Sequence, residues 1–349
     1  MIAVNIIGYG LILLFCFVLL ARIVDLFFIA SLDKISKDLR LSSDAAGATL
    51  MAVGSSAPEL FVALFAVLKP GEHQAIGIGS IVGSAIFNLL IIVGVAAYVS
   101  KKDTKLTWQP IIRDLLFYTI TVALLVWFIW DKTFTITEAV VFLGVYVLYV
   151  LAVIYWRKLL PYSDMHYTED TEDATGNQNF VIKYIDKFLQ FIFPPSKKYY
   201  FVFLFSIVLI AAISYVLVEV AVVSAHILGI PEAIIALTVL AVGTSVPDLI
   251  SSAIVAKQGR GDMAVSNAIG SNIFDILVGL GLPFLIVMLG SGEVISAGGD
   301  LVVSSVILFA SVIILFILLL ISKWKIGKIT GVLLISMYFF YLVWEIIIR

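Results

Sequence analysis

Charged side chains are scarce in this chain of 349 residues: they make up 13% of the sequence, against 62% hydrophobic residues. The mean hydropathy of +1.13 exceeds what a soluble domain of this length needs to bury a core. The formal net charge is −2 and no block of basic residues is present, so the charge pattern does not indicate a nucleic-acid partner. This composition excludes an ordinary soluble protein and favours an integral membrane protein.

Cysteine occurs once, as Cys16, which rules out a disulfide within the chain. Cys16 lies in an apolar run and is expected to pack as a small hydrophobic side chain. A basic segment before this run is also missing, and the run, at about residues 3–30, is too long for the apolar core of a signal peptide. We therefore expect it to be retained as the first transmembrane helix.

Long apolar runs are abundant, and they predict an all-α membrane protein with ten transmembrane helices, because runs of this length exclude the short strands of a membrane barrel. The spans are expected at about residues 3–30, 44–68, 74–99, 110–130, 134–156, 199–227, 231–256, 262–289, 299–321 and 327–348. The polar stretch at about 157–198 has few apolar residues and is interpreted as a linker. Its end, near 183–193, is either a short amphipathic helix on the membrane surface or a plain loop.

Lysine and arginine are distributed unevenly between the two sides of the predicted membrane. With the N-terminus outside, the cytoplasmic loops near 34–40, 101–105, 157–198, 257–260 and 323–328 hold 17 of the 22 basic residues. The opposite side holds Lys69, Lys132 and Arg349. The positive-inside rule then predicts a cell-membrane protein with both termini outside and the linker in the cytoplasm.

Two polar segments inside the apolar runs are versions of one another. Gly-Ser-Ser-Ala-Pro-Glu-Leu at 54–60 matches Gly-Thr-Ser-Val-Pro-Asp-Leu at 243–249, and Gly-Ser-Ala-Ile-Phe-Asn at 83–88 matches Gly-Ser-Asn-Ile-Phe-Asp at 270–275. The copies are offset by 189 and 187 residues. Carboxylates in apolar runs are costly and indicate function. A polar segment interrupted by glycine and proline and repeated in each half is typical of a transporter's binding site.

Five spans in each half is an odd number, so the second half should enter the membrane from the opposite face. The chain then consists of two inverted repeats, 1–156 with the motif 54–94 and 199–349 with the motif 243–283, joined by the linker 157–198. Gly54 and Pro58 are expected to break the second helix, and Gly243 and Pro247 the seventh, because proline removes a backbone donor. The inversion should bring these two broken helices together near the middle of the membrane.

Oxygen-bearing side chains in the motifs recur four residues apart, which places both members of a pair on one helix face. The pairs are Ser55 with Glu59, Thr244 with Asp248, Ser84 with Asn88, and Ser271 with Asp275; Ser56, Ser245 and Asn272 are further candidates. The three histidines, at 73, 166 and 226, lie outside the motifs. All-oxygen ligation selects hard cations such as Ca²⁺ and Na⁺ rather than zinc, copper or iron. Three clustered carboxylates should hold cations, or protons when no cation is bound.

Some of these residues also have a purely structural interpretation. Small residues let membrane helices pack closely, which is our expectation for Gly83, Gly94, Gly270 and Gly281. Ser84 and Ser271 fit either packing or ligation, since each lies one turn before a polar residue. Arg22, Asp25 and Glu219 lie in or near the spans without such a motif, and Arg22 and Asp25 are expected to pair with each other.

The two motif regions, 54–59 with 79–88 and 243–248 with 261–277, resemble the two α-repeats of sodium/calcium exchangers, members of the cation/Ca²⁺ antiporter superfamily. This resemblance implies an electrogenic secondary antiporter that exchanges about three Na⁺ for one Ca²⁺ by alternating access, in which spans 1 and 6 slide across the core. It implies that Glu59 and Asp248 are the central Ca²⁺ ligands, shared with Na⁺. The other residues it implies are Ser55 and Thr244 for both ions, Ser56, Ser84, Ser245 and Ser271 for flanking Na⁺ sites, Asn88 and Asp275 at the centre, and the carbonyls of Ala52 and Ala241 at the two ends.

Some features are similar to the potassium-dependent branch of that family, namely Asp248, Asp275 and the run Asp-Met-Ala-Val-Ser-Asn at 262–267. Prokaryotic relatives carry the aspartate at position 275 without needing K⁺, so K⁺ co-transport stays open. The linker of about 40 residues is too short for the large Ca²⁺-sensing domains of animal exchangers, and no such domain and no cofactor are expected.

Three other classes of protein compete with this hypothesis. A H⁺/Ca²⁺ antiporter of the same superfamily is the nearest, although the hydroxyl-rich motifs favour Na⁺. A cation channel would repeat its filter about an axis along the pore, whereas this duplication is inverted. An intramembrane protease built on Asp248 and Asp275 would leave Glu59 and the first motif unexplained, so we do not expect an enzyme. The oligomeric state is not indicated.

Overall fold

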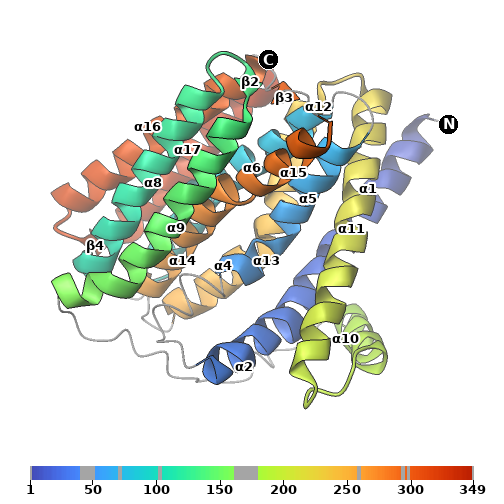
Figure 1. The fold of residues 1–349 in the computed structure, drawn as a ribbon, viewed down its shortest axis with the longest axis horizontal. Helices are drawn as coiled ribbons and strands as arrows, with labels where there is room; N and C mark the ends of the chain where they lie inside the picture. The colour runs from blue at the N-terminus through green and yellow to red at the C-terminus, as the bar shows by residue number, and fades with distance from the viewer. Residues whose placement is uncertain are drawn as a thin grey trace.

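A computed structural model describes residues 2–39, 52–69, 73–100, 104–160, 180–257, 261–291, 295–296 and 299–347. These parts of the chain are almost entirely helical (Figure 1). The first half contains α1 Ile2–Ile23, η1 Val24–Ile29, α2 Ala30–Asp38, α4 Ala52–Ser55, α5 Ala57–Leu68, α6 Gln74–Phe87, η3 Asn88–Ile92, α7 Val93–Val99, β1 Thr104–Lys105, α8 Trp108–Phe128, β2 Thr133–Phe134 and α9 Ile136–Leu159. The second contains α10 Phe180–Ile192, α11 Tyr199–Leu228, α12 Glu232–Ile235, η4 Ala236–Leu240, α13 Ala241–Lys257, α14 Gly261–Leu277, α15 Gly281–Ser291, β3 Ile295–Ser296, α16 Gly299–Ile321, β4 Lys325–Ile326 and α17 Lys328–Ile347.

Eight helices in the described part of the chain are long and apolar enough to cross a membrane. They correspond to all the expected spans except the second and the seventh. In place of those two the structure has shorter apolar helices, Ala57–Leu68 and Glu232–Val246, and residues 44–51 of the second span lie outside the described residues. The all-helical membrane class therefore agrees with the structure, while the number ten stays a prediction.

The two motif helices depart from regular geometry in different ways. The second span is interrupted at Ser56, between α4 and α5, and Pro58 lies in the first turn of α5, where its missing donor does no harm. The prediction of a matching break at Gly243 and Pro247 is wrong, since α13 runs through both. The irregularity lies one turn earlier, in the π-helical segment η4. A proline inside a helix removes only one hydrogen bond, which the helix tolerates here without ending.

The buried apolar side chains form two large clusters, and these divide the helices into two groups. One cluster is built from α1, η1, α2, α10 and α11, with parts of α5, α6, α12 and η4. The other is built mainly from α6 to α9 and α13 to α17. Figure 1 shows α1 and α11 side by side along one edge of the molecule, with α4, α5 and α13 between them and the remaining bundle.

Two short antiparallel strand pairs close the bundle at opposite ends (Figure 1). Strand β1 pairs with β4, and β2 pairs with β3. Both pairs join the loop between two helices of the first half to a loop in the second half. The two halves of the chain are therefore tied together at both ends of the bundle.

The linker ends in a helix, α10, which settles the choice left open between helix and loop. The expected pairing of Arg22 with Asp25 is found only as a charge interaction between the two side chains. Arg22 Nε and Nη2 instead donate to Asp186 Oδ1 and Oδ2 of α10, both at 2.7 Å. A bidentate contact of this kind suits the planar guanidinium group, and only the tertiary fold brings Asp186 within its reach.

Candidate functional site

The four motif segments meet in the middle of the protein. The break between α4 and α5 carries Ser55, Ser56 and Glu59; α6 and η3 carry Ser84 and Asn88; α13 carries Thr244, Ser245 and Asp248; and α14 carries Ser271, Asn272 and Asp275. All of these side chains are buried except that of Asp248, which is half-buried. A dense group of buried polar side chains inside apolar helices is costly unless the groups satisfy one another or a ligand.

Hydrogen bonds join the first motif to the second at three places. The hydroxyls of Ser55 and Ser271 lie 3.2 Å apart. The hydroxyl of Ser245 donates to Glu59 Oε1 at 3.5 Å. Asn88 Nδ2 donates to Asn272 Oδ1 at 3.0 Å. The segments predicted from the duplication to meet are therefore in direct contact, although more than 180 residues separate the partners in the sequence.

The three carboxylates lie close enough to influence one another electrostatically. Asp248 and Asp275 both interact with the charge of Glu59, and Asp275 also interacts with that of Asp248. Ser56 lies beside Asp275, and Thr244 lies beside Glu59. Like charges held together in a medium of low dielectric constant repel strongly, and a bound cation relieves that repulsion.

Four oxygen atoms of this cluster are buried and have no hydrogen-bond partner among the described residues: Ser56 Oγ, Glu59 Oε2, Asn88 Oδ1 and Asp275 Oδ1. An unsatisfied buried acceptor costs about 1–3 kcal/mol, and more when it is charged. The Ser56 hydroxyl can also donate, whereas Glu59 Oε2, Asn88 Oδ1 and Asp275 Oδ1 are acceptors. Three free acceptors in one cluster indicate a site for something electropositive. Metal cations fit this description, since each accepts lone pairs from several oxygens at once.

Carboxylates alone do not make this site. Among the residues that the structure describes, no three Asp, Glu, His or Cys side chains are grouped tightly enough to hold a metal by themselves. A cation would therefore also need the hydroxyl and amide oxygens that surround the acids. This mixed set of oxygens matches a hard cation rather than a soft metal.

Other predicted ligands have hydroxyls that are engaged by their own helices. Ser84 Oγ donates to the carbonyl of Ile81 at 3.2 Å, and Thr244 Oγ1 donates to that of Leu240 at 3.1 Å. Each oxygen keeps lone pairs with which it can accept a cation. Ala52 lies in α4 and Ala241 lies in α13, and the two predicted carbonyl ligands correspond to each other in the duplicated motif.

Asn272 is a residue whose importance the sequence indicated only weakly. Its Nδ2 donates to the carbonyl of Ala85 at 3.0 Å and to the hydroxyl of Tyr118 at 2.9 Å, while its Oδ1 accepts from Asn88. This arrangement fixes the orientation of the Asn88 amide, so that Asn88 Oδ1 is the atom left free. Tyr118 carried no signal in the sequence, because a tyrosine in an apolar span is unremarkable until its neighbours are known.

Replacing Asn272 by leucine should release the amide of Asn88 and weaken cation binding. A lost buried hydrogen bond of about 1–3 kcal/mol corresponds to roughly a 5- to 150-fold higher Ca²⁺ concentration for half-maximal binding or uptake. Tyr118→Phe removes only the outermost contact and should change this concentration by less than the leucine variant does. Calcium titrations of both purified variants measure the difference. Equal affinities for Asn272→Leu and the unaltered protein would contradict the positioning role.

A second buried polar network lies behind this site. Asp114 of α8 accepts hydrogen bonds from Arg113 Nε at 2.8 Å, from the hydroxyl of Tyr149 at 3.2 Å and from that of Ser266 at 3.0 Å. It links α8 and α9 to α14, one turn of α8 before Tyr118. The sequence held a signal for it, since Asp114 is an acid inside an apolar span. Its satisfied hydrogen bonds mark it as a structural anchor for α14.

Helix α1 and its continuations run past both motif glycines. A Cβ atom on Gly243 would lie 2.2 Å from the ring of Phe17, and one on Gly54 would lie 2.8 Å from Leu32. Asp25 has no motif around it, yet η1 places it within electrostatic range of Asp248. The first span therefore borders the candidate site over much of its length.

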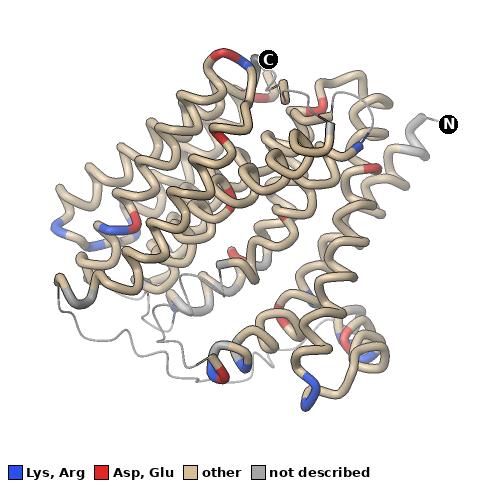
Figure 2. The backbone as a smooth tube through the Cα atoms, in the orientation of Figure 1, with Lys and Arg blue, Asp and Glu red and all other residues tan. Residues whose placement is uncertain are grey.

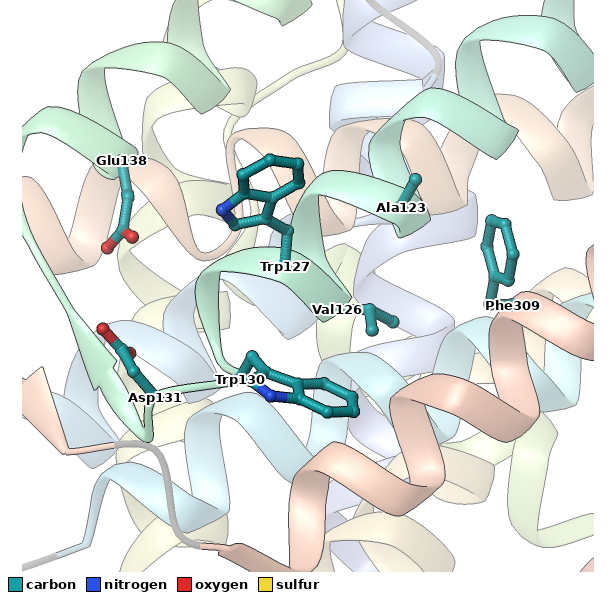
Figure 3. A pocket seen from close by; sticks show the side chains of 7 residues that line it. All are labelled: Ala123, Val126, Trp127, Trp130, Asp131, Glu138 and Phe309. Carbon is teal, nitrogen blue, oxygen red and sulfur yellow. The ribbon is translucent and has the colours of Figure 1, made fainter.

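A surface pocket of about 600 Å³ lies away from the motifs (Figure 3). Two strongly exposed indoles, Trp127 and Trp130, line it, and Figure 3 shows the carboxylates of Asp131 and Glu138 on the same side. Exposed tryptophans at the end of a spanning helix are typical of the interfacial aromatic belt of membrane proteins. We do not assign this pocket to the candidate site.

Comparison with known proteins places this arrangement in a family. The family model described as sodium/calcium exchanger protein matches residues 9–155 and 198–347. The human sodium/potassium/calcium exchanger 5 is 32% identical to this chain, over 96% of this chain and 82% of its own length. The human sodium/potassium/calcium exchanger 4 is 28% identical, with 96% and 80% covered.

Solved structures share the fold. The sodium-calcium exchanger NCX_Mj superposes with a TM-score of 0.60 at 23% identity, covering 97% of this chain and 98% of its own. The H⁺/Ca²⁺ exchanger CAX superposes with a TM-score of 0.71 at 15% identity, covering 98% and 82%. Because the family model matches most of the chain and includes both motif regions, this protein belongs to the sodium/calcium exchanger family.

Proposed function

We propose that this protein is a secondary active antiporter that exchanges Na⁺ for Ca²⁺ across a membrane. The observation that carries the proposal is the cluster of buried, partnerless oxygens from Ser56, Glu59, Asn88 and Asp275, contributed by both halves of the chain. Membership of the exchanger family and the naming of its relatives support the choice of Na⁺ and Ca²⁺. An oxygen cage of this size suits both ions because their hardness and radii are similar.

In this proposal the cation ligands are those expected from the sequence. Glu59 and Asp248 are the central ligands for Ca²⁺ and also bind Na⁺. Asn88 and Asp275 complete the centre. Ser55, Thr244, Ser56, Ser245, Ser84, Ser271 and the carbonyls of Ala52 and Ala241 form the flanking positions. Exchange of about three Na⁺ for one Ca²⁺ moves net charge, so the transport is electrogenic.

The two halves are proposed to be inverted five-helix repeats, 1–156 and 199–349, joined by the linker 157–198. The strand pairs support this symmetry. Strand β3 lies 191 positions after β1, and β4 lies 192 after β2, close to the offset between the motifs. If one half is superposed on the other, β1 corresponds to β3 and β4 corresponds to β2. The pair β1·β4 therefore corresponds to the pair β3·β2, and these two pairs lie at opposite ends of the bundle (Figure 1). A two-fold axis in the membrane plane produces this relation.

Alternating access is proposed to occur by movement of the group formed by α1, η1, α2, α10 and α11 against the remaining bundle. The division of the buried apolar side chains into two clusters supports such a movement, although the smaller cluster also includes side chains of α5, α6, α12 and η4 at the boundary. The ring of Phe17 lies directly against Gly243, so α1 approaches α13 closely at the boundary between the two groups.

The orientation is proposed from the basic residues. Figure 2 shows them gathered mainly at the end of the bundle that carries β4, α2 and α10, with few at the opposite end. The positive-inside rule then assigns the linker to the cytoplasm and both termini to the outside of a cell membrane.

Flux measurements on purified protein in liposomes test the proposal. Liposomes loaded with Na⁺ and diluted into Na⁺-free medium containing ⁴⁵Ca²⁺ should accumulate Ca²⁺, and the uptake should vanish when Na⁺ is equal on both sides. Repeating the assay with and without K⁺ decides whether K⁺ is co-transported. Uptake driven by a pH gradient without Na⁺ would replace the proposal with H⁺/Ca²⁺ exchange, and flux that needs no counter-ion would replace it with a channel.

A further inference from the structure

Helix α10 lies where the first span leaves the membrane. The elements α1, η1 and α2 form one continuous helical stretch from Ile2 to Asp38, about 55 Å long at 1.5 Å per residue. The hydrocarbon core of a bilayer is only about 30 Å thick, so the end that carries Lys34, Lys37 and Asp38 extends beyond it. Helix α10 contacts α1, and Figure 1 shows it beside the start of α11.

One face of α10 is fixed to the first span. Its Asp186 holds Arg22 through two hydrogen bonds of 2.7 Å. Just after the helix, the ring of Phe193 stacks on that of Phe27, with centroids 3.7 Å apart and planes 13° apart. Asp186, Leu189 and Phe193 are all buried. These contacts join α10 to the first span.

The opposite face of α10 is aromatic and uncovered. Tyr184, Phe188 and Phe191 are 58%, 59% and 87% exposed, and their spacing places them in one stripe. Lys183 and Lys187 are also exposed and flank this stripe on one side. Three large rings that are each more than half exposed in a short helix are unfavourable in water.

The chemistry of this face matches a lipid surface. Aromatic rings beside lysines are the composition of helices that lie in the headgroup region, where the rings enter the boundary of the acyl chains and the ammonium groups contact anionic headgroups. Continuity with the membrane supports the same partner. Helix α11 begins seven residues after α10 ends, and its exposed face is apolar from the first turn, with Phe201 and Leu204 at 65% and 57% exposure.

We propose that the stripe of Tyr184, Phe188 and Phe191 docks α10 onto the leaflet nearest the linker, where Lys183 and Lys187 bind anionic lipid headgroups. Because Arg22 and Asp186 join α10 to α1, this docking ties the position of the first span to the charge of the membrane. Anionic lipid then changes the transport rate without contacting the ion site. The docking itself does not depend on which ions are exchanged.

Lipid quenching of a fluorophore on α10 tests the docking without measuring transport. The full chain carrying Phe191→Cys, labelled there with bimane in place of the ring, is placed in nanodiscs of phosphatidylcholine alone or with one quarter phosphatidylglycerol, each containing a nitroxide headgroup lipid. Quenching should be strong with the anionic lipid. The double variant Lys183→Gln with Lys187→Gln should lower the ratio of docked to free α10 by a factor on the order of ten. The matched control, Lys325→Gln with Lys328→Gln, removes two exposed lysines on the other side of the bundle and should leave quenching unchanged.

Several outcomes overturn the docking. Quenching that is absent, or equal in neutral and anionic membranes, excludes the lysine–headgroup contact. Shielding of the bimane that grows with protein concentration and is independent of lipid assigns the stripe to contact with a second copy of this chain.

The connection to α1 is tested by the transport rate. Wild-type flux should differ severalfold between neutral and anionic liposomes, and this ratio should fall to near one in Lys183→Gln with Lys187→Gln. Arg22→Gln combined with Phe193→Ala removes both the ion pair and the ring stack that join α10 to the first span. This double variant should keep the lipid-dependent quenching but lose the lipid dependence of the flux, and a flux ratio that persists in it would overturn the coupling through α1. Absence of Na⁺-driven flux in every membrane counts against the proposed function, whereas the quenching result stands independently of it.

Discussion

Glu59→Gln and Asp248→Asn are each expected to abolish Na⁺-driven Ca²⁺ uptake while the protein still folds. Both substitutions keep the shape of the side chain and remove only its charge. Removing one partner from a buried charged cluster costs about 3–5 kcal/mol, which corresponds to a loss on the order of a hundredfold or more in cation affinity. Uptake of ⁴⁵Ca²⁺ into Na⁺-loaded liposomes measures the loss, and the elution profile in detergent checks the folding.

Glu345→Gln is the matched control for these two variants. Glu345 is a fully buried acid in α17 that is not among the proposed ligands, and it accepts a hydrogen bond from Ser304 Oγ at 3.3 Å. If any buried acid were needed merely for folding, this variant would fail in the same way. We expect it to retain uptake. Substantial uptake by Glu59→Gln, or equal loss in all three variants, would contradict the proposed role of the central carboxylates.

Gly83→Ala is expected to destabilise the protein, whereas the equivalent change Gly270→Ala is expected to be tolerated. A Cβ atom on Gly83 would lie 2.5 Å from the carbonyl oxygen of Leu237 and 2.7 Å from the Cβ of Ala241, where α6 crosses η4 and α13. The nearest atom to a Cβ atom on Gly270 would be the hydroxyl oxygen of Tyr149, at 3.7 Å. Overpacking against a backbone costs about 1–3 kcal/mol, while a substitution into open space usually stays within about 0.5 kcal/mol.

Thermal unfolding followed by size-exclusion chromatography in detergent compares these two variants directly. Gly83→Ala should have a clearly lower midpoint temperature than the unaltered protein, and Gly270→Ala should match it. The two glycines occupy the same place in the duplicated motif, so each serves as the control for the other. Equal midpoints for both variants would show that the crossing at Gly83 is less tight than the structure indicates.

This pair of glycines shows where prediction from the sequence stops. The sequence analysis expected close packing at Gly83 and Gly270 alike, because small residues let membrane helices approach closely. The structure places a neighbouring backbone against only one of them. Pro58 and Pro247 differ in the same way, since the helix is interrupted before the first and continuous through the second. Local patterns record what each segment is made of, but not what packs against it.

The sequence by itself determined the membrane class, the duplicated polar segments and the oxygen chemistry of the candidate site. These follow from composition, and from the high cost of placing polar groups in an apolar run without a purpose. Only the tertiary structure decided which atoms remain free. Asn272 orients Asn88, and Tyr118 accepts a hydrogen bond from Asn272. Asp186, rather than the nearby Asp25, accepts the hydrogen bond from Arg22 Nε. Each of these contacts joins residues far apart in the chain, and a contact of that kind exists only after the helices have packed.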